Sequence, residues 1–334
     1  MSTILSTKRR RSTQLLWSKL DQYVGPIINK GLVLAISGGP DSRALLESMA
    51  RWRPRLGARI LVVCLDHVVR EQSRAEARIT LMRARRLGFK IKHIELFSDN
   101  NLGEQELRER RYKNLIKACE SINTKYICTA HHRDDNAEGY LMSLFGIGGG
   151  ALGAAMDAYE PMGAYTIVRP FVGITKKSLL LSLSLSNYTD FVVDNLDQDR
   201  AGQRAWVRHE VLPQMAAHEA RIAERLAYFA QQERLKKAAL TRLAHNLIIW
   251  SDQEALIKLD SDPEPVLIDM AIRHVLKKWS KNLDLRQAGV TVAKLAGLDH
   301  SSKKIIVKNS EARKFALPGA MAFSNGREIV IKRV

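Results

Sequence analysis

Short apolar stretches alternate with amphipathic stretches over the first half of the chain. The apolar stretches are rich in β-branched residues and occupy residues 32–37, 58–67, 89–96, 125–132 and 165–171. Such runs are typical of strands that are buried on both faces. The segments between them have the apolar spacing of helices, at residues 41–52, 73–87, 104–121, 133–145 and 175–187.

This alternation predicts an α/β fold, an open parallel sheet with helices on both faces. Ligands of such sheets bind beyond the carboxyl ends of the strands. Polar residues follow three of the predicted strands at that edge: Ser37, the pair Asp66 and His67, and the pair His131 and His132. We therefore expect the chemistry of the protein to lie there.

The pattern changes after about residue 213. Residues 213–247 predict one long charged helix, and residues 248–334 give shorter helix and strand signals with a β-like end. Asn325-Gly326 is a hairpin signal within that end. We predict an N-terminal domain over 1–215, a helical linker over 216–247 and a small α/β C-terminal domain over 248–334.

The chain is strongly basic. It carries 53 Lys and Arg against 35 Asp and Glu, a formal net charge of +18. Residues 1–200 hold 30 basic and 21 acidic residues, and residues 201–334 hold 23 and 14, so the excess is spread over both parts. The charge favours a polyanionic partner such as nucleic acid, with a basic enzyme lacking such a partner as the alternative.

Cysteine content and hydropathy limit the classes of protein that fit. Cys64, Cys119 and Cys128 are isolated, so neither a disulfide framework nor a zinc finger is supported. No apolar run approaches the length of a membrane span, and we expect a cytoplasmic protein. The first 20 residues lack acidic side chains, which is compatible with a transit segment but favours a basic arm or a first helix.

The loop after the first predicted strand carries the strongest chemical signal. Ser37-Gly38-Gly39-Pro40-Asp41-Ser42 lies between a strand and a helix, where backbone N–H groups and the helix N-terminus can surround phosphate oxygens. A Walker A loop would need a lysine, which is absent here. SGGxDS is instead typical of pyrophosphate loops, in enzymes that cleave ATP between its α- and β-phosphates.

A second glycine-rich stretch is interpreted differently. Residues 148–153 match the letters GxGxxG, yet they follow a helical pattern and not a strand. A dinucleotide-binding turn requires the strand before it, so we interpret this stretch as a flexible loop.

Residues 129–144, TAHHRDDNAEGYLMSL, form a dense polar cluster. On a helix Asp134 and Glu138 share a face, with Asp135 beside them. Paired carboxylates at the end of a strand can bind Mg²⁺ or an ammonium group. The alternative is an acidic helix start favoured by the helix dipole, which the adjacent His131-His132 makes the weaker interpretation. The spacing does not match a zinc site.

Two further segments give weaker signals by themselves. Arg108 and Arg111 are three residues apart on a predicted helix, as in any basic helix. Asp194, Arg204 and Arg208 precede a helix and could belong to a charged surface loop.

Together these segments resemble the tRNA(Ile)-lysidine synthetases. The resemblance is carried by SGGPDS, LDHVVREQSRAEA, LRERRY, TAHHRDDNAE, VRPF and the D…D…R…VRHEVLP series, in matching order over roughly residues 30–215. HHxDDxAE is the most discriminating of them. The resemblance implies an ATP-dependent ligase with a pyrophosphate-loop catalytic domain and a C-terminal tRNA-binding domain.

The reaction implied by the resemblance joins L-lysine to the 2-position of the cytidine at the first anticodon position of tRNA(Ile) with anticodon CAU. ATP adenylates the 2-carbonyl oxygen, the lysine amine attacks that carbon, and AMP and pyrophosphate are released. ATP and Mg²⁺ are the implied cofactors, and both a monomer and a homodimer fit. An unpaired anticodon loop also suits the chemistry, because the target base must leave its stack.

The resemblance also implies roles for individual residues. The nucleotide is expected to contact Ala35, Ile36, Ser37, Gly38, Gly39, Pro40, Asp41, Ser42, His67 and Arg70. The expected catalytic set is Asp41, Arg108, Arg111, His132, Asp134, Asp135 and Glu138, with Mg²⁺ on Asp41 and Asp135. The arginines would stabilise developing charge, the acidic residues of 134–138 would position lysine or metal, and His132 would accept a proton. Asp194, Arg204 and Arg208 are assigned to the tRNA side or to a closing loop.

Two other functions remain open from the residues alone. A tRNA thiolase of the same fold would need a cysteine that carries sulfur, whereas Cys64 and Cys128 lie in strand-like runs typical of a core. An RNA-binding homologue without activity is the other alternative, against which the intact SGGPDS loop argues.

Overall fold

A computed structural model describes most of the chain. The described residues are 2–52, 59–66, 71–95, 104–147, 155–184, 202–259, 264–279, 313–317, 320–324 and 328–333. They form two compact units, Met1–Gln232 and Glu233–Val334. Within the described residues no helix combines the length and the apolar character that crossing a membrane requires.

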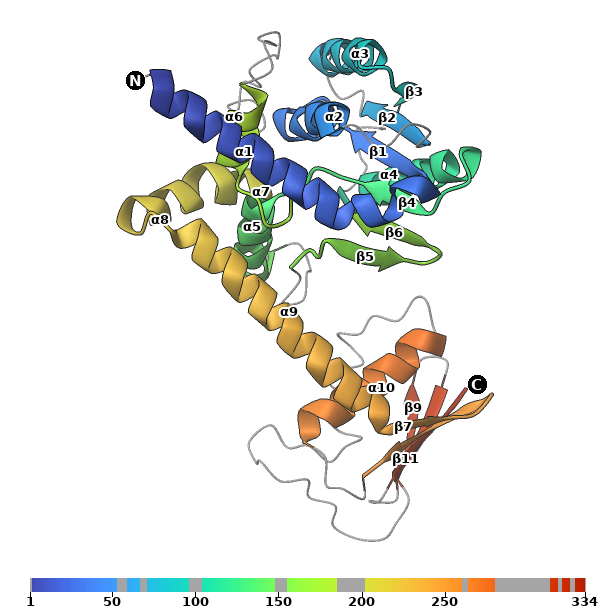
Figure 1. Cartoon of the computed structure of the whole chain (residues 1–334). Helices are drawn as coiled ribbons and strands as arrows, with labels where there is room; N and C mark the ends of the chain where they lie inside the picture. Colours follow the sequence, from blue (N-terminus) through green and yellow to red (C-terminus); the bar gives the residue numbers. More distant parts are fainter. Residues whose placement is uncertain are drawn as a thin grey trace. The chain divides into compact units, whose positions relative to one another are not determined.

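The first unit is built on a six-stranded sheet (Figure 1). Its strands are β1 (Leu32–Ile36), β2 (Ile60–Asp66), β3 (Lys90–Glu95), β4 (Tyr126–Cys128), β5 (Tyr159–Met162) and β6 (Tyr165–Val168). The order is β3-β2-β1-β4-β6-β5. Neighbouring strands are parallel except at the edge, where β5 pairs antiparallel with β6. The predicted strands and the open α/β class are confirmed, with one antiparallel edge strand that the pattern did not predict.

Helices cover both faces of this sheet. The helices of the first unit are α1 (Ser2–Tyr23), α2 (Pro40–Trp52), α3 (Glu71–Arg86), α4 (Glu104–Ser121), α5 (Arg133–Leu144), α6 (Lys176–Leu183), α7 (Gln203–Trp206) and α8 (Leu212–His218), with a 3₁₀ turn at Gly25–Lys30 and a π-helical turn, η3, at Val207–Val211. Alternate residues of β1 enter different cores: Leu32, Leu34 and Ile36 face α1, α2 and α6, whereas Val33 packs with the buried side of α4. This two-sided burial explains the nearly continuous apolar strands.

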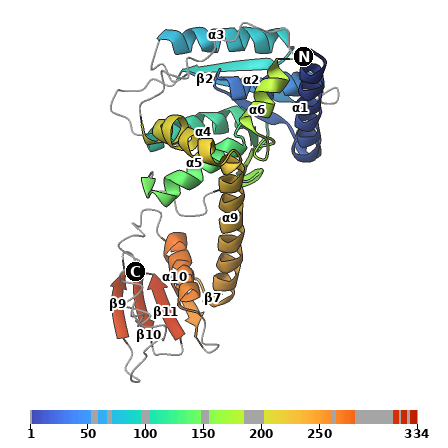
Figure 2. The same ribbon diagram turned by 90° about the vertical axis from the view of Figure 1, so that its left-hand side faces the viewer.

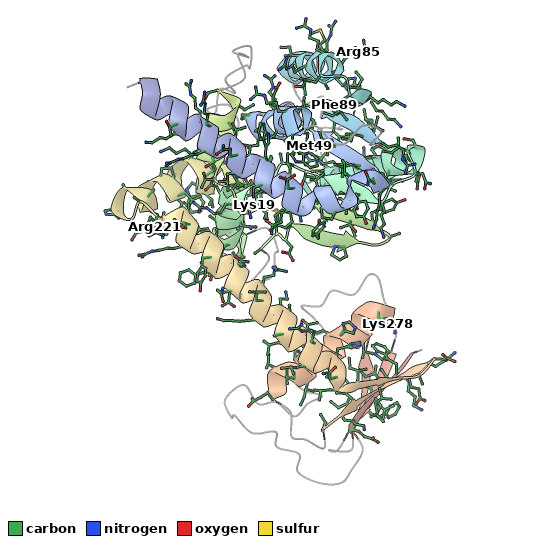
Figure 3. The ribbon with its side chains drawn as sticks, viewed as in Figure 1. Lys19, Met49, Arg85, Phe89, Arg221 and Lys278 are labelled. Carbon is green, nitrogen blue, oxygen red and sulfur yellow. The ribbon has the colours of Figure 1, made fainter. Side chains whose placement is uncertain are left out.

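The basic N-terminus is a helix of the core and not a separate arm. Leu16 and Leu20 of α1 are fully buried in the cluster that also holds Met49 and Phe89, and α1 packs beside α2 and α6 (Figures 1 and 3). Exposed basic side chains such as Arg85, Arg221 and Lys278 are distributed over both units (Figure 3).

The prediction of one long helix over residues 213–247 is wrong. α8 ends at His218, and α9 (Ile222–Asn246) begins after a break. Glu219 has an extended backbone, and its carboxylate accepts a hydrogen bond from the N–H of Arg221 at 3.1 Å. The side chain thus satisfies an N–H group at the start of α9, which a continuous helix would satisfy with a carbonyl.

The second unit contains an antiparallel five-stranded sheet in the order β7-β8-β11-β10-β9. The strands are β7 (Ile248–Trp250), β8 (Glu254–Lys258), β9 (Arg313–Leu317), β10 (Ala320–Ser324) and β11 (Glu328–Arg333). α10 (Pro265–Trp279) lies beside the sheet (Figure 2) and buries Ile268, Ile272 and Val275 against it. Asn325-Gly326 lies outside the described residues, but β10 and β11 pair antiparallel around it. The division into three predicted domains stays a prediction.

We expect the burial of α1 to contribute directly to stability. Leu16→Ala removes a fully buried side chain and should lower the free energy of unfolding by about 2–5 kcal/mol. Urea denaturation followed by circular dichroism measures the loss. Leu15→Ala is the matched control, because the Leu15 side chain is 42% exposed and its removal should have little effect. Equal losses for the two variants would contradict the packing of this helix.

Candidate active site at the carboxyl edge of the sheet

The loop between β1 and α2 is held by its own polar groups. Gly38 has φ 95°, in the left-handed region that glycine adopts without strain. Its N–H donates to Ser42 Oγ at 3.1 Å, and the Ser42 hydroxyl donates to the Gly39 carbonyl at 2.9 Å. The buried Arg43 Nε donates to the Gly38 carbonyl at 2.9 Å. These bonds order the loop at the start of α2.

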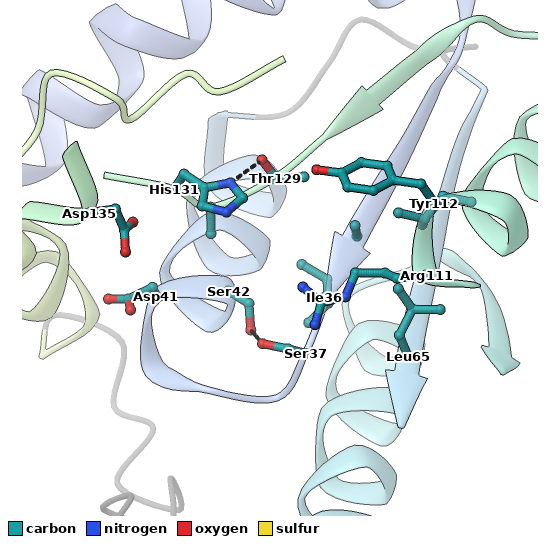
Figure 4. Close-up of a pocket in the computed structure, with 13 residues that line it drawn as sticks. Ile36, Ser37, Asp41, Ser42, Leu65, Arg111, Tyr112, Thr129, His131 and Asp135 are labelled. Carbon is teal, nitrogen blue, oxygen red and sulfur yellow. Dashed lines mark hydrogen bonds between the residues drawn. The ribbon is translucent and has the colours of Figure 1, made fainter. Parts of the chain in front are cut away.

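A pocket opens beside this loop at the carboxyl ends of β1, β2 and β4 (Figure 4). Seven predicted site residues line it: Ala35, Ile36, Ser37, Asp41, Ser42, Arg111 and Asp135. In Figure 4, Asp41 and Asp135 lie on one side and Arg111 and Tyr112 on the other. The pocket therefore combines apolar walls, loop hydroxyls and charges of both signs, which is the composition of a small-molecule site.

His132 is buried among three carboxylates. Its Nε2 lies 3.4 Å from Asp41 Oδ2, and its Nδ1 lies 3.7 Å from Asp134 Oδ2 and 3.6 Å from Asp135 Oδ2. Burial lowers the pKa of His132, but the hydrogen bond to Asp41 and the three negative charges outweigh burial and raise the pKa overall. For Asp41 burial raises the pKa, and His132, Lys176 and Arg208 together lower it below its usual value.

Asp134 and Asp135 also bind backbone groups. Asp134 Oδ2 accepts the N–H of Lys176 at 2.6 Å, at the N-terminus of α6. Asp135 Oδ2 accepts the N–H of His132 at 2.8 Å, at the N-terminus of α5. Both carboxylates are thus oriented by helix starts, where negative charge is favoured.

Glu138 is clamped by two arginines that lie far along the chain. Arg208 forms a bidentate pair with it, with Nε–Oε1 and Nη2–Oε2 distances of 2.7 Å, and Arg204 Nε lies 3.1 Å from Oε2. The same arginines approach Asp135 Oδ1 at 3.5 and 3.7 Å. Below the ion pairs, apolar side chains of α5, η3 and α9 pack together, including Ala137, Leu141, Val207 and Leu226.

His131, next to His132 in sequence, has the opposite electrostatic environment. The pKa of His131 is lowered to about 4, mainly by burial. The negative charge of Asp135 raises this pKa, whereas the positive charges of Arg169, Arg204 and Arg108 lower it. The imidazole is therefore neutral at pH 7. It lines the pocket, with its Nδ1 2.8 Å from Thr129 Oγ1 (Figure 4).

The structure brings most of the predicted site residues together but not all of them. Arg108 lies on the exposed side of α4, with its guanidinium 5.2 Å from the centre of the Tyr112 ring, and it is not among the pocket-lining residues. His67, Arg70 and Asp194 lie outside the described residues, as does the 148–153 loop. The catalytic and binding roles assigned to individual residues stay predictions.

Sequence reasoning gave no individual role to six residues that line the pocket, although it placed one of them, His131, at this edge of the sheet. They are Leu65, Tyr112, Leu115, Thr129, Ala130 and His131. Thr129, Ala130 and His131 directly follow β4, so their position at a strand end was an available signal. Leu65 lies in a predicted buried strand, and Tyr112 and Leu115 lie in a predicted amphipathic helix, so the pattern gave no signal that they line a pocket.

The three cysteines are buried, and all of them lie in the described part of the chain. Burial raises the pKa of the Cys119 thiol to about 12, helped by Glu120, and raises the pKa of Cys128 as well. Neither thiol is ionised at neutral pH, so neither is an activated nucleophile.

Fold and site together define a nucleotide-binding α/β protein with a pyrophosphate-type loop. A family model described as a PP-loop domain matches residues 13–215. tRNA(Ile)-lysidine synthases are similar to the chain. The enzyme of Methylobacterium nodulans is 31% identical to it, over 75% of this chain and 72% of that enzyme's length. The enzyme of Rhodopseudomonas palustris is 34% identical, over 70% of this chain and 66% of that enzyme's length. The U34-tRNA thiolase of Methanococcus maripaludis shares the fold, with a TM-score of 0.53 at 11% identity, covering 67% of this chain and 79% of that one.

The chain therefore belongs to the tRNA(Ile)-lysidine synthase family of PP-loop enzymes. Membership of this ATP-binding family implies that ATP is used.

The raised pKa of His132 predicts a pH-dependent contribution to stability. A group whose folded-state pKa exceeds its unfolded value of 6.5 stabilises fully below that value, and its contribution is lost as the pH rises through the folded-state pKa. His132→Gln should therefore lower the Tm by a few degrees below about pH 6.5, with a smaller loss at alkaline pH. Calorimetry across this range measures the difference, with the exposed His218→Gln as the control. A loss that grew with pH would contradict a raised pKa of His132.

Proposed function

We propose that the protein forms lysidine at the first anticodon position of tRNA(Ile) with anticodon CAU, using ATP and L-lysine. The observation that carries the proposal is the ordered SGGPDS loop, which lines one pocket together with the carboxylate of Asp135 and the guanidinium of Arg111. The names of the relatives support the substrate and product. The chain's charge of +18 supports a polyanionic substrate.

In the first step the 2-carbonyl oxygen of cytidine attacks the α-phosphorus of ATP, and pyrophosphate leaves. The 37–42 loop would hold the phosphates, with adenine against Ala35 and Ile36. Arg111, which lines the same pocket, would stabilise negative charge that develops during the transfer. Arg108 is assigned the same task from the outer side of α4, where RNA would approach.

Mg²⁺ fits the acidic side of the pocket. Asp41 Oδ1 is buried and has no hydrogen-bond partner among the described residues, and a divalent cation would satisfy it. Mg²⁺ often binds through one or two carboxylates together with substrate phosphates, so the absence of a larger ligand cluster in the described residues is compatible with it. Asp41 would be a direct ligand, with Asp135 beside it, and the ion would neutralise phosphate charge.

In the second step the lysine amine attacks C2 of the adenylated base, a C–N bond forms, and the C–O bond to AMP breaks. Lysine arrives as a cation with a pKa of about 10.4, so the site must bind the ammonium group and remove a proton. Asp134, Asp135 and Glu138 would supply the negative charge. We assign the proton to His132 or to one of these carboxylates. His131 also lines the pocket, but its pKa of about 4 makes it a weak base.

The alternative functions have less support. Sulfur transfer would need an accessible thiol, whereas all three cysteines are buried. A binding protein without activity would not need an ordered pyrophosphate loop beside a buried acidic cluster. Detection of lysidine in the nucleosides of tRNA incubated with ATP and lysine distinguishes the proposed function from both alternatives.

Asp41→Asn tests the assignment of the loop. Removing the charge should reduce tRNA-dependent pyrophosphate release by at least about 100-fold, because phosphate and metal handling depends on it. Affinity for tRNA should be retained, since the basic surface is unchanged. Both quantities are compared with those of Asp269→Asn, which removes a carboxylate that pairs with Arg273 in the second unit. Near-normal pyrophosphate release by Asp41→Asn would refute the assignment.

Glu138→Gln tests whether the clamped carboxylate serves the lysine step. We expect a raised lysine KM or slower lysidine formation, with a smaller effect on pyrophosphate release, because adenylation precedes attack by the amine. Glu47→Gln is the matched control: Glu47 is a buried carboxylate held by Arg83 at 2.5 and 3.0 Å. The control matches the loss of a buried ion pair without touching the site. Equal loss of both half-reactions in Glu138→Gln would move Glu138 to the ATP side of the mechanism.

A further inference from the structure

Two aromatic side chains, which we call the 145/206 aromatic pair, are exposed at the ends of α5 and α7. Phe145 and Trp206 are 50% and 41% exposed, and Leu144 next to them is also exposed. The ring centroids are 5.8 Å apart, and the planes are inclined at 48°. Because the rings do not stack face to face, each retains a face on which another ring can lie.

The pair lies on the elements that carry the ion-pair clamp. Phe145 caps the C-terminus of α5, the helix that holds Asp135 and Glu138. Trp206 ends α7, between Arg204 and Arg208 in the chain. The buried cluster of Ala137, Leu141 and Val207 packs these elements together, so the positions of both rings are set by the same core as the clamp.

Charge decides which partner suits this surface. A second copy of the chain would bring another +18, and like charges oppose association. A polyanion is favoured, and an unpaired nucleobase is the part of a polyanion that stacks on aromatic rings. Asp135 lines the pocket and approaches Arg204 and Arg208, the two arginines on either side of Trp206 in the chain.

We propose that the 145/206 aromatic pair stacks an unpaired RNA base that neighbours the base being modified. The proposal rests on the proposed function and adds a positioning site to it. A base that enters the pocket leaves its neighbour without a stacking partner, and the aromatic pair replaces that partner. The pair would thereby orient the anticodon loop over the acidic cluster without touching the reacting atoms.

The experiment uses the full-length chain and an anticodon stem-loop RNA with 2-aminopurine on either side of the target cytidine. Binding to the wild type should quench the 2-aminopurine at one of the two positions. Trp206→Ala should abolish the quenching and raise the Kd by about 5- to 100-fold, the range expected for loss of one base stack. Phe145→Leu, which keeps an apolar side chain but lacks a ring, should also weaken binding, whereas Trp206→Phe should retain most of it.

Controls separate stacking from a loss of folding. Each variant should bind ATP as the wild type does, and Phe145→Leu keeps the test valid if Trp206→Ala unfolds. Tyr228→Ala removes an aromatic side chain that is 57% exposed on α9, and it should leave the Kd unchanged.

Three outcomes would overturn the proposal. The 2-aminopurine could remain unquenched in the wild-type complex, or a folded Trp206→Ala variant could bind RNA with unchanged affinity. The third is that Trp206→Ala changes the oligomeric mass of the protein and not its RNA affinity. If the wild type forms lysidine and Trp206→Ala binds RNA normally, the stacking site alone is refuted. If the wild type forms no lysidine and Trp206→Ala binds RNA more weakly than the wild type, the proposed function is refuted and the stacking site remains.

Discussion

A buried carboxylate needs positive charge nearby, and for Glu138 this charge comes from arginines in a segment that follows it by about 70 residues in sequence. The bidentate pair with Arg208 and the contact of Arg204 fix α7 and η3 against α5. Loss of the arginines would leave the Glu138 carboxylate buried without its partners, although both arginines are themselves partly exposed to solvent. The position of the 202–211 segment therefore depends on Glu138, with Asp135 and the apolar cluster around Val207 as further contacts.

The same charge balance determines the protonation states in the site. Asp41, Asp134, Asp135 and Glu138 face Lys176, Arg204, Arg208 and His132, so neither sign dominates. The carboxylates around His132 raise its pKa, whereas burial and the nearby arginines lower the pKa of its neighbour His131 to about 4. A nucleotide or an amine that enters would change this balance, which couples binding to the positions of the arginines.

The fold was predictable where burial on both faces left a continuous apolar signal, as in β1 and β2. β5 was missed because Tyr159–Met162 contains Pro161 and alternates between exposed and half-buried residues. Proline is tolerated at the edge of a sheet, where its missing N–H faces no partner strand. The break before α9 was not predicted because the composition of residues 213–247 is helical throughout. The hydrogen bond from the Arg221 N–H to the Glu219 carboxylate at this break is not visible in the sequence pattern.

The sequence by itself determined the phosphate loop, since Gly38 and the residues around it specify a local conformation, and it placed the two histidines and the acidic residues after β4. Only the tertiary structure decided which of these groups meet. Sequence spacing assigned Asp134 and Glu138 to one helix face, but contacts assigned Asp134 to the start of α6 and Glu138 to Arg204 and Arg208. Local propensity acts over a few residues, whereas the pKa of a buried group depends on every charge within several ångströms, wherever it lies in the chain.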